Sequence, residues 1–473
     1  MLGVHGVKVS RWSMAYFAVA VGSVLLAEIL LATGLADPVA TVQSGWSLAA
    51  LHLTTVGWLT ILILGALQQF VPVLTVTELT SQRLAGVTLG FLGVGLAGLV
   101  GGFIGLAGGV GSPLAALLPW GGACVMAAVL LAGFNLGGSL ARSRPWTLSV
   151  WFIATGMGFL WLTVGLGLTF ALALTASSPT VGTFADYVLA RGLPAHIAGG
   201  LVGWLTLTAM GVSYKLLAMF ALAPEHRSGW AKASYGLTTA GVALVWAGAF
   251  WPRDQLGAAM ADVGWAFGWL GLAAFVVEME RLFRQRKRRH LELNARAGRG
   301  AVRALAALLV AALVVHLAPS DPRASLALGF YGLYGWLGGL GWSQLYKIVP
   351  FLTWIERWGH AMGRTRTPRV QDLVVESRDR WAFMVYHAAI LAAAAGLALG
   401  SEAAFRIAMG VGWLCTLDIA RALWRARYAS PSLPTARRPG SVAWPNAGAP
   451  AVSPGDREPR PRLPDRAAKE GDA

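Results

Sequence analysis

Charge and cysteine are both scarce in this chain. Of its 473 residues only 13% are charged and 56% are hydrophobic, whereas ordinary soluble domains carry about 25% charge. The two cysteines, Cys124 and Cys415, lie within apolar runs, which excludes a disulfide framework and a Cys-x-x-Cys metal site. A phosphate-binding loop, a Gly-x-Ser-x-Gly elbow, a His-Glu-x-x-His motif and a dinucleotide fingerprint are also missing from any suitable context. The composition therefore excludes a soluble enzyme and predicts a polytopic membrane protein.

Acidic residues are scarcer than basic ones. The 38 Lys and Arg residues outnumber the 22 Asp and Glu residues, which gives a net charge of +16. In a soluble chain such an excess would indicate nucleic-acid binding, but here the basic residues fall between hydrophobic spans, where they set orientation in the membrane. The expected partner is the lipid bilayer, and no nucleic acid is expected.

Hydrophobic runs of membrane-spanning length follow one another along most of the chain. The first, at 14–36, is too long for the apolar region of a cleaved signal peptide. We predict an all-α transmembrane domain over 14–427, with a short cytoplasmic lead at 1–13 and a disordered cytoplasmic tail rich in Pro and Arg at 428–473. The eleven further spans are predicted at 46–74, 84–110, 114–138, 147–175, 194–222, 230–252, 258–280, 301–319, 325–354, 381–400 and 402–425.

One stretch occurs three times without a gap. Each copy begins at a Gly-Trp pair and runs through mostly apolar residues to a polar pair. The copies are Gly57-Trp58 to Gln68-Gln69, Gly203-Trp204 to Tyr214-Lys215, and Gly335-Trp336 to Tyr346-Lys347. They fall in the second, sixth and tenth of the twelve predicted helices, so the chain divides into three units of four helices. This spacing predicts three four-helix arcs with pseudo-threefold symmetry.

The connections between spans predict the orientation. Those after even-numbered spans hold most of the basic residues, including the dense segment 281–303, whereas those after odd-numbered spans hold only Arg191, Arg253 and Arg323. By the positive-inside rule both termini are cytoplasmic, in a bacterial-type inner (plasma) membrane. The RKRR run at 286–289 is interpreted as a topological signal, and binding of anionic lipid is the alternative.

Histidines precede two of the three Gly-Trp pairs. His52 lies six residues before the first tryptophan and His196 lies eight residues before the second, while the third copy has Leu328 and Phe330 at those offsets. Imidazole is the usual protein donor to heme iron and copper, and a histidine within a span indicates function by default. The alternative for each is a hydrogen bond to backbone or water near the membrane interface.

The sequence resembles the catalytic subunit of the heme-copper oxidases, most closely the branch of the cbb3-type oxidases and nitric-oxide reductases. The histidine and the Val-Pro exit of the stretch from His52 to Pro72 are similar to the second helix of that family. The stretch from Gly335 to Pro350 (GW…YKIVP) is similar to its tenth helix. The resemblance spans essentially all twelve predicted helices and implies the three-arc fold. It also implies that His52 is a low-spin heme ligand and that His196 lies near a copper ligand.

The chain departs from the family at most of its metal ligands. The resemblance implies a His-x-His in the span 325–354, whose side chains would point about 200° apart and face two hemes, but this chain has Leu328 and Phe330 there. It also implies a histidine pair for copper in the span 230–252, which holds no histidine. Copper, and reduction of oxygen or nitric oxide by the mechanism of that family, are therefore not expected.

The remaining cofactor expectation is at most one b-type heme. Its first axial ligand would be His52, and the heme would either be five-coordinate or recruit His196, His316 or a residue of a partner subunit. Family members bind heme propionates through arginines near the outer face, which makes Arg406 a candidate for that role.

Further ionisable residues lie within or beside the spans. His387 and Asp418 are predicted at similar depth in the last two helices, as a pair that forms either a packing hydrogen bond or part of a proton path. Glu28 is a lone acid in the first helix and is one candidate partner for Arg406. Glu402, four residues before Arg406, is the simpler partner.

These observations predict a membrane protein similar to heme-copper oxidase subunit I but without an intact binuclear centre. It would serve electron transport, or act as an accessory to a respiratory or denitrification complex. The alternative is a cofactor-free transporter or assembly factor. The presence of a heme absorption band separates the two hypotheses.

Overall fold

The structure is a computed structural model that describes residues 5–428 apart from short gaps at 109–111, 176–178, 225–227, 252–254, 319–320, 363 and 366. The tail predicted at 428–473 lies, apart from Tyr428, outside the described residues. The described part of the chain consists of helices and their connections, without a strand. The predicted all-α polytopic membrane fold is confirmed.

The helices follow the predicted spans closely. In chain order the elements are α1 (His5–Thr33), α2 (Gly45–His52), η1 (Leu53–Thr60), α3 (Ile61–Thr75), α4 (Gln82–Ala107), α5 (Leu117–Arg142), α6 (Leu148–Thr175), α7 (Pro179–Ile197), η2 (Ala198–Thr206), α8 (Leu207–Ala221), α9 (Gly229–Phe250), α10 (Gln255–Arg284), α11 (Leu293–Leu317), α12 (Pro322–Tyr331), η3 (Gly332–Gly338), α13 (Gly339–Trp358), η4 (Gly359–Ala361), η5 (Val370–Leu373), α14 (Glu376–Ala398) and α15 (Glu402–Tyr428).

Three of the long helices are composite. The helix α2–η1–α3 spans Gly45–Thr75, α7–η2–α8 ends at Ala221, and α12–η3–α13 spans Pro322–Trp358, so the described residues form twelve long helices. Eleven of these are long and apolar enough to cross a membrane, and α12–η3–α13 is not among them. That helix is rich in glycine and polar side chains, and most of α13 is buried against other helices. Such a helix needs less apolar surface because its neighbours shield it from lipid.

Two helix starts differ from the sequence-based prediction. Helix α1 begins at His5, so most of the predicted 1–13 lead is helical. Tertiary contacts begin, among the described side chains, at Trp12 and Ser13. Ser13 Oγ donates to the Gly65 carbonyl at 2.9 Å, and the Trp12 ring packs directly on Gly86 of α4. Helix α7 begins at Pro179 instead of 194. Its Pro194 lies inside the helix, although proline favours the first turn.

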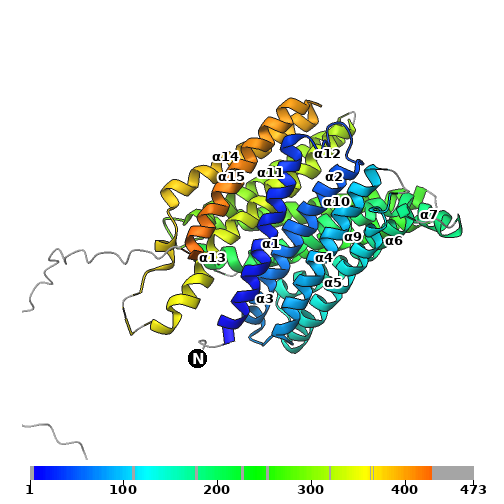
Figure 1. Ribbon diagram of the computed structural model, residues 1–473. Helices are drawn as coiled ribbons and strands as arrows, with labels where there is room; N and C mark the ends of the chain where they lie inside the picture. The colour runs from blue at the N-terminus through cyan, green and yellow to red at the C-terminus, as the bar shows by residue number, and fades with distance from the viewer. Residues whose placement is uncertain are drawn as a thin grey trace, which may run out of the picture. The chain divides into compact units, whose positions relative to one another are not determined.

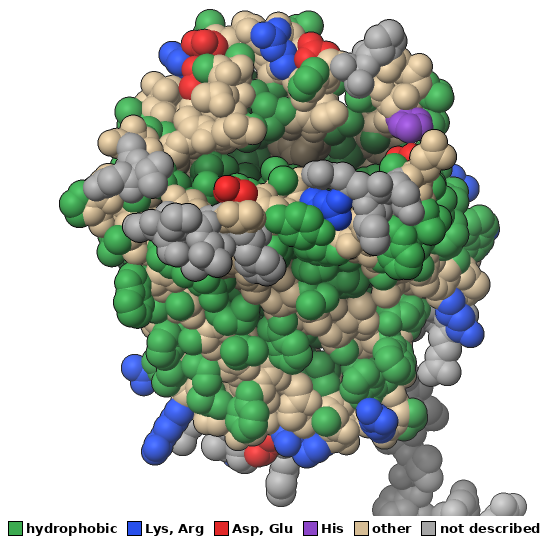
Figure 2. Space-filling view, turned by 90° about the vertical axis from the view of Figure 1, so that its right-hand side faces the viewer, with side chains coloured by type: hydrophobic (Ala, Val, Ile, Leu, Met, Phe, Trp, Pro, Cys, Tyr) green, Lys and Arg blue, Asp and Glu red, His purple; other side chains and the backbone are tan. Residues whose placement is uncertain are grey.

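The long helices run side by side in one bundle (Figure 1). Helix α1 packs against η1, α3 and α15, so the first and last helices are neighbours. We name the end where α1 ends and α2 begins the upper end, and the opposite end the lower end (Figure 1). In Figure 2 a broad band of hydrophobic side chains covers the bundle, with Lys and Arg along its lower edge and a hollow near its upper end. This band fits a surface that faces lipid.

Candidate functional site

The three Gly-Trp stretches each form a π-helical segment. The first Gly-Trp pair lies in η1, the second in η2 and the third in η3. Wide turns of this kind are rare and are found frequently at functional sites. The internal repeat predicted from the sequence is therefore also a repeat of local structure.

The glycine of each pair lies where another group comes close to the helix. A Cβ on Gly57 would approach Ser23 Cβ of α1 to 2.7 Å, and one on Gly203 would approach Phe159 Cγ of α6 to 2.7 Å. On Gly335 the nearest atom would be Tyr331 Cε2 at 2.9 Å. At Gly57 and Gly203 a neighbouring helix is packed too closely for a side chain, whereas at Gly335 the close group is a tyrosine ring of the same composite helix.

The π-helical segments meet at the centre of the bundle. Segment η3 contacts both η1 and η2, and Trp204 Nε1 of η2 donates to Thr60 Oγ1 of η1 at 3.0 Å. The repeated tryptophans, Trp58, Trp204 and Trp336, are at most 1% exposed. The three tryptophans recur at the same offset in the repeat because each is buried where the three composite helices meet.

His52 is the last residue of α2 and lies directly before η1. Its Nδ1 is 2.8 Å from the Leu48 carbonyl oxygen, and its ring lies 4.6 Å from the ring of Phe103 in α4. A carbonyl oxygen only accepts hydrogen bonds, so Nδ1 carries the proton and Nε2 carries a lone pair. This is the tautomer that binds metals through Nε2.

His196, on the second composite helix, also has its Nδ1 beside a backbone carbonyl, but that carbonyl belongs to a neighbouring helix. His196 lies two residues before η2, and its Nδ1 is 3.1 Å from the Thr163 carbonyl oxygen of α6. Its ring packs against Phe170 at 5.4 Å, and a Cβ on Gly167 would approach His196 Cε1 to 2.9 Å. The geometry again leaves Nε2 as the lone-pair nitrogen.

His52 and His196 lie just ahead of the first and second π-helical segments. Both are half-buried in the upper part of their helices, and no described residue forms a hydrogen bond with either Nε2. Three residues after His196, Gly199 packs beside Thr163 Oγ1 and Trp246 Nε1, two buried polar atoms without a protein partner. Unpaired polar atoms of this kind indicate an unseen water or ligand.

His52 and His196 each leave one imidazole nitrogen available to a ligand. Two neutral imidazoles with open Nε2 atoms form the donor set of a b-type heme. The described residues contain no group of three His, Cys, Asp or Glu side chains that could hold a metal ion. In the third repeat, the ring of Phe330 lies 4.8 Å from Tyr334 and 5.6 Å from Phe405. Aromatic packing therefore occupies this position, where the resemblance implied a ligand.

His316 makes no contact with His52 or His196 in the described part of the chain. It lies exposed in the last turn of α11, and no ring contact or hydrogen bond with a described residue is recorded for it. Sequence position alone made it a candidate for a second axial ligand. His196, by contrast, is half-buried and packs against Phe170.

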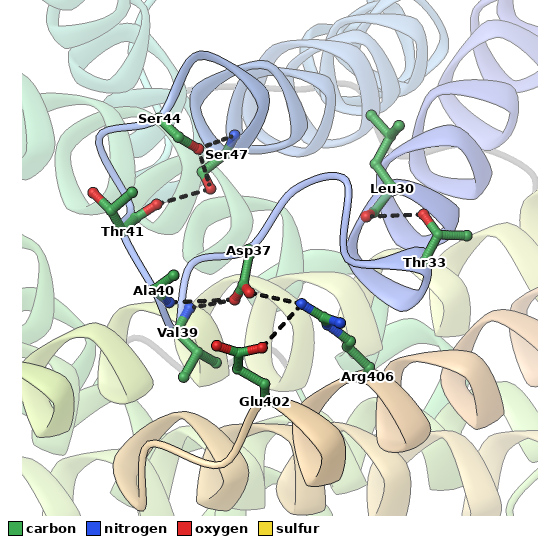
Figure 3. A network of polar contacts seen from close by, with 10 residues as sticks. All are labelled: Leu30, Thr33, Asp37, Val39, Ala40, Thr41, Ser44, Ser47, Glu402 and Arg406. Carbon is green, nitrogen blue, oxygen red and sulfur yellow. Dashed lines mark hydrogen bonds and ion pairs between the residues drawn. The ribbon is translucent and has the colours of Figure 1, made fainter. Parts of the chain in front are cut away.

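Arg406 is engaged by two carboxylates (Figure 3). Its Nη2 donates to Asp37 Oδ2 at 2.8 Å and to Glu402 Oε2 at 3.1 Å. The guanidinium lies against Gly34, which has a φ of 77° and no room for a Cβ. The predicted pairing with Glu402 is confirmed. The contacts with Asp37 and Gly34 fasten the turn after α1 to α15.

The alternative partner for Arg406, Glu28, is bound elsewhere. Its Oε1 accepts a hydrogen bond from Thr416 Oγ1 at 3.1 Å. Glu28 and Arg406 were candidate partners because both lie toward the upper end. Thr416 lies ten residues after Arg406 in the same helix, which is about 15 Å further down. This difference in depth prevents the ion pair.

The predicted pair of His387 and Asp418 is not formed. Asp418 Oδ1 instead accepts from Arg378 Nη2 at 3.4 Å, and His387 Nε2 is buried without a hydrogen-bond partner among the described residues. His387 faces α13, where a Cβ on Gly339 would come within 2.5 Å of its Cε1. The two residues were predicted at similar depth, but Asp418 is directed toward Arg378 and His387 toward α13.

A cluster of ion pairs at the lower end was not predicted from the sequence. Lys347 Nζ donates to Glu292 Oε2 at 2.5 Å, and Arg299 Nη2 donates to Glu280 Oε2 at 2.6 Å. These pairs join α11 to α13 and to α10. Only the density of charge between 280 and 303 could have indicated them, because their partners are distant in sequence.

Comparison of the chain with protein-family models and with curated proteins gives no match.

Proposed function

We propose that the protein is a membrane heme protein similar to heme-copper oxidase subunit I but without the binuclear centre. It binds at most one b-type heme, with His52 as first axial ligand and His196 as second. It serves electron transfer, alone or as an accessory to a respiratory or denitrification complex in a bacterial-type inner membrane. The observation that supports this most directly is that both imidazoles have Nδ1 beside a backbone carbonyl, which leaves Nε2 of each as the nitrogen with a lone pair.

The residues around the proposed heme site have distinct roles. A b-type heme, when bound, supplies a one-electron carrier. The carbonyls of Leu48 and Thr163 fix the tautomer of the two imidazoles and orient their rings. Phe103 restricts rotation of the His52 ring. Such contacts lower the entropic cost of ligand binding because the donors are already oriented.

The first experiment measures the spectrum of the purified protein. Cells are supplied with a heme precursor, and the protein is examined in detergent by oxidised and reduced absorption spectra and by a quantitative heme assay. We expect a Soret band, a reduced α band and no more than one heme per chain. A colourless protein made with heme in excess would refute the proposal and favour the cofactor-free transporter or assembly factor.

The same preparation tests for copper and turnover. No stoichiometric copper is expected, and no reduction of oxygen or nitric oxide with an artificial donor, because Leu328, Phe330 and α9 supply no imidazole. Turnover abolished by changing His196 would contradict this part of the proposal.

Orientation is tested by reporter fusions. The basic connections predict that both termini lie in the cytoplasm, so a reporter joined after residue 430 should be active only when it is of the cytoplasmic type. A reporter fused in the loop between α1 and α2 should be active only when it is of the periplasmic type. A periplasmic signal after residue 430 would mean an odd number of membrane crossings.

A further inference from the structure

Glu28 is a carboxyl group buried in the membrane-spanning part of α1. Its side chain is 0% exposed. Oε1 accepts the hydrogen bond from Thr416 Oγ1 at 3.1 Å, while Oε2 is buried with no hydrogen-bond partner among the described residues. One oxygen of this carboxyl is thus oriented by α15, and the other is free to carry a hydrogen.

The groups around Glu28 bring no positive charge. Helix α15 contributes Thr416 and Cys415, η3 contributes Tyr334, and α14 contributes Tyr386, all within electrostatic or hydrogen-bonding range. Of the other elements packed against α1, neither η1 nor α3 contains a charged residue, and α2 contains only His52 as a titratable group. The charged residues of α4 and α13 lie in the lower turns of those helices, at Arg83, Lys347, Glu356 and Arg357. An ionised carboxylate in such a site lacks both water and a counter-ion, which is strongly unfavourable.

The nearest arginine toward the upper end is already occupied. Arg406 lies ten residues before Thr416 on α15, about 15 Å along the helix axis, and it binds Asp37 and Glu402. Figure 3 shows this cluster at the turn after α1. Arg406 therefore neutralises carboxylates at the surface of the bundle and leaves Glu28 without a cation.

Hydroxyl groups extend from Glu28 toward the centre of the bundle. Tyr334 Oη and Thr54 Oγ1 are 2.7 Å apart, and Tyr386 Oη donates to the Tyr334 carbonyl at 3.0 Å. A Cβ added to Gly338 would lie 3.0 Å from Tyr386 Oη and 3.8 Å from Trp58 Nε1, so both polar atoms lie beside this glycine. Trp58 Nε1 has no partner in the described structure. Buried polar groups of this kind are commonly joined by ordered water.

We propose that Glu28 is a proton-binding site inside the membrane. The proton resides on Oε2 while Oε1 accepts from Thr416, and the site is bordered by the hydroxyls of Tyr334 and Tyr386. A carboxyl in this position is a loading point for a proton-coupled step at the junction of η1 and η3. The proposal does not depend on heme binding, since none of these residues is a candidate axial ligand.

The proposal is tested on the full chain in detergent or lipid vesicles with dicyclohexylcarbodiimide, which modifies protonated carboxyl groups in apolar surroundings. Peptide mapping by mass spectrometry should find the label at Glu28, at a rate that falls as the pH is raised. Infrared spectroscopy should show a protonated carboxyl C=O band that shifts in deuterium oxide. Both measurements use the wild-type chain, so they do not depend on the folding of a variant.

Three variants assign the signals. Glu28→Gln should remove the label and the infrared band. Glu402→Gln, at the surface of the upper end, should leave both unchanged. Glu278→Gln controls for the other fully buried glutamate, on α10, and should affect only a label at position 278.

Two results would overturn the proposal. If position 28 acquires no label and the wild-type protein shows no infrared band attributable to it, Glu28 is ionised and has a counter-ion. If sodium at constant pH protects Glu28 from the reagent, the site binds a metal cation instead of a proton.

Discussion

Changing His52 to alanine is expected to remove bound heme. The variant loses the first imidazole of the proposed site, and since loss of even an indirect partner of a metal ligand lowers affinity about 10–100-fold, we expect at least a ~100-fold loss. Heme titration of purified protein, followed at the Soret band, measures this change. His316→Ala is the matched control, because that histidine is exposed at the end of α11, and it should retain wild-type heme content.

The His196→Ala variant distinguishes one axial ligand from two. If His52 and His196 both bind the iron, wild-type protein should respond little to carbon monoxide. His196→Ala should then hold heme more weakly and respond to carbon monoxide, because a coordination position is open. A heme content and spectrum unchanged in His52→Ala would place the site elsewhere, and loss of heme only in His316→Ala would refute the choice of ligands.

A leucine at Gly121 is expected to disrupt the packing of α4 against α5. A Cβ at this position would lie 2.5 Å from the Leu99 backbone nitrogen and 2.7 Å from the Gly98 backbone carbon. Backbone cannot move aside as a flexible side chain can, so the helices must separate. Overpacking costs about 1–3 kcal/mol, occasionally more, and we expect a lower unfolding temperature and less monodisperse protein in detergent.

The matched control is Gly137→Leu on the same helix. A Cβ at Gly137 would meet nothing within 4 Å, and leucine has a higher helix propensity than glycine by roughly 1 kcal/mol. This variant should be as stable as the wild type or slightly more stable. Equal destabilisation at both positions would show that loss of glycine, and not the close approach of α4, is responsible.

The sequence determined the architecture because its signals are local and repeated. Hydrophobic runs of membrane-spanning length gave the helices, with differences such as the start of α7 at Pro179. The recurring Gly-Trp pair identified the three composite helices, and in the first two copies the glycine is needed because a residue of a neighbouring helix approaches closely. The pairing of Arg406 with Glu402 was also predictable, because four residues along a helix bring two side chains to one face.

Only the tertiary structure decided which polar residues meet. Depth along a helix can be read from sequence, but the direction of a side chain around the helix depends on how neighbouring helices are rotated and packed. This is why His387 and Asp418 were paired by the sequence and separated by the fold, and why Thr416, 388 positions away, was not foreseen as the partner of Glu28. The orientation of His52 and His196 likewise depends on backbone carbonyls and aromatic rings that the sequence pattern does not reveal.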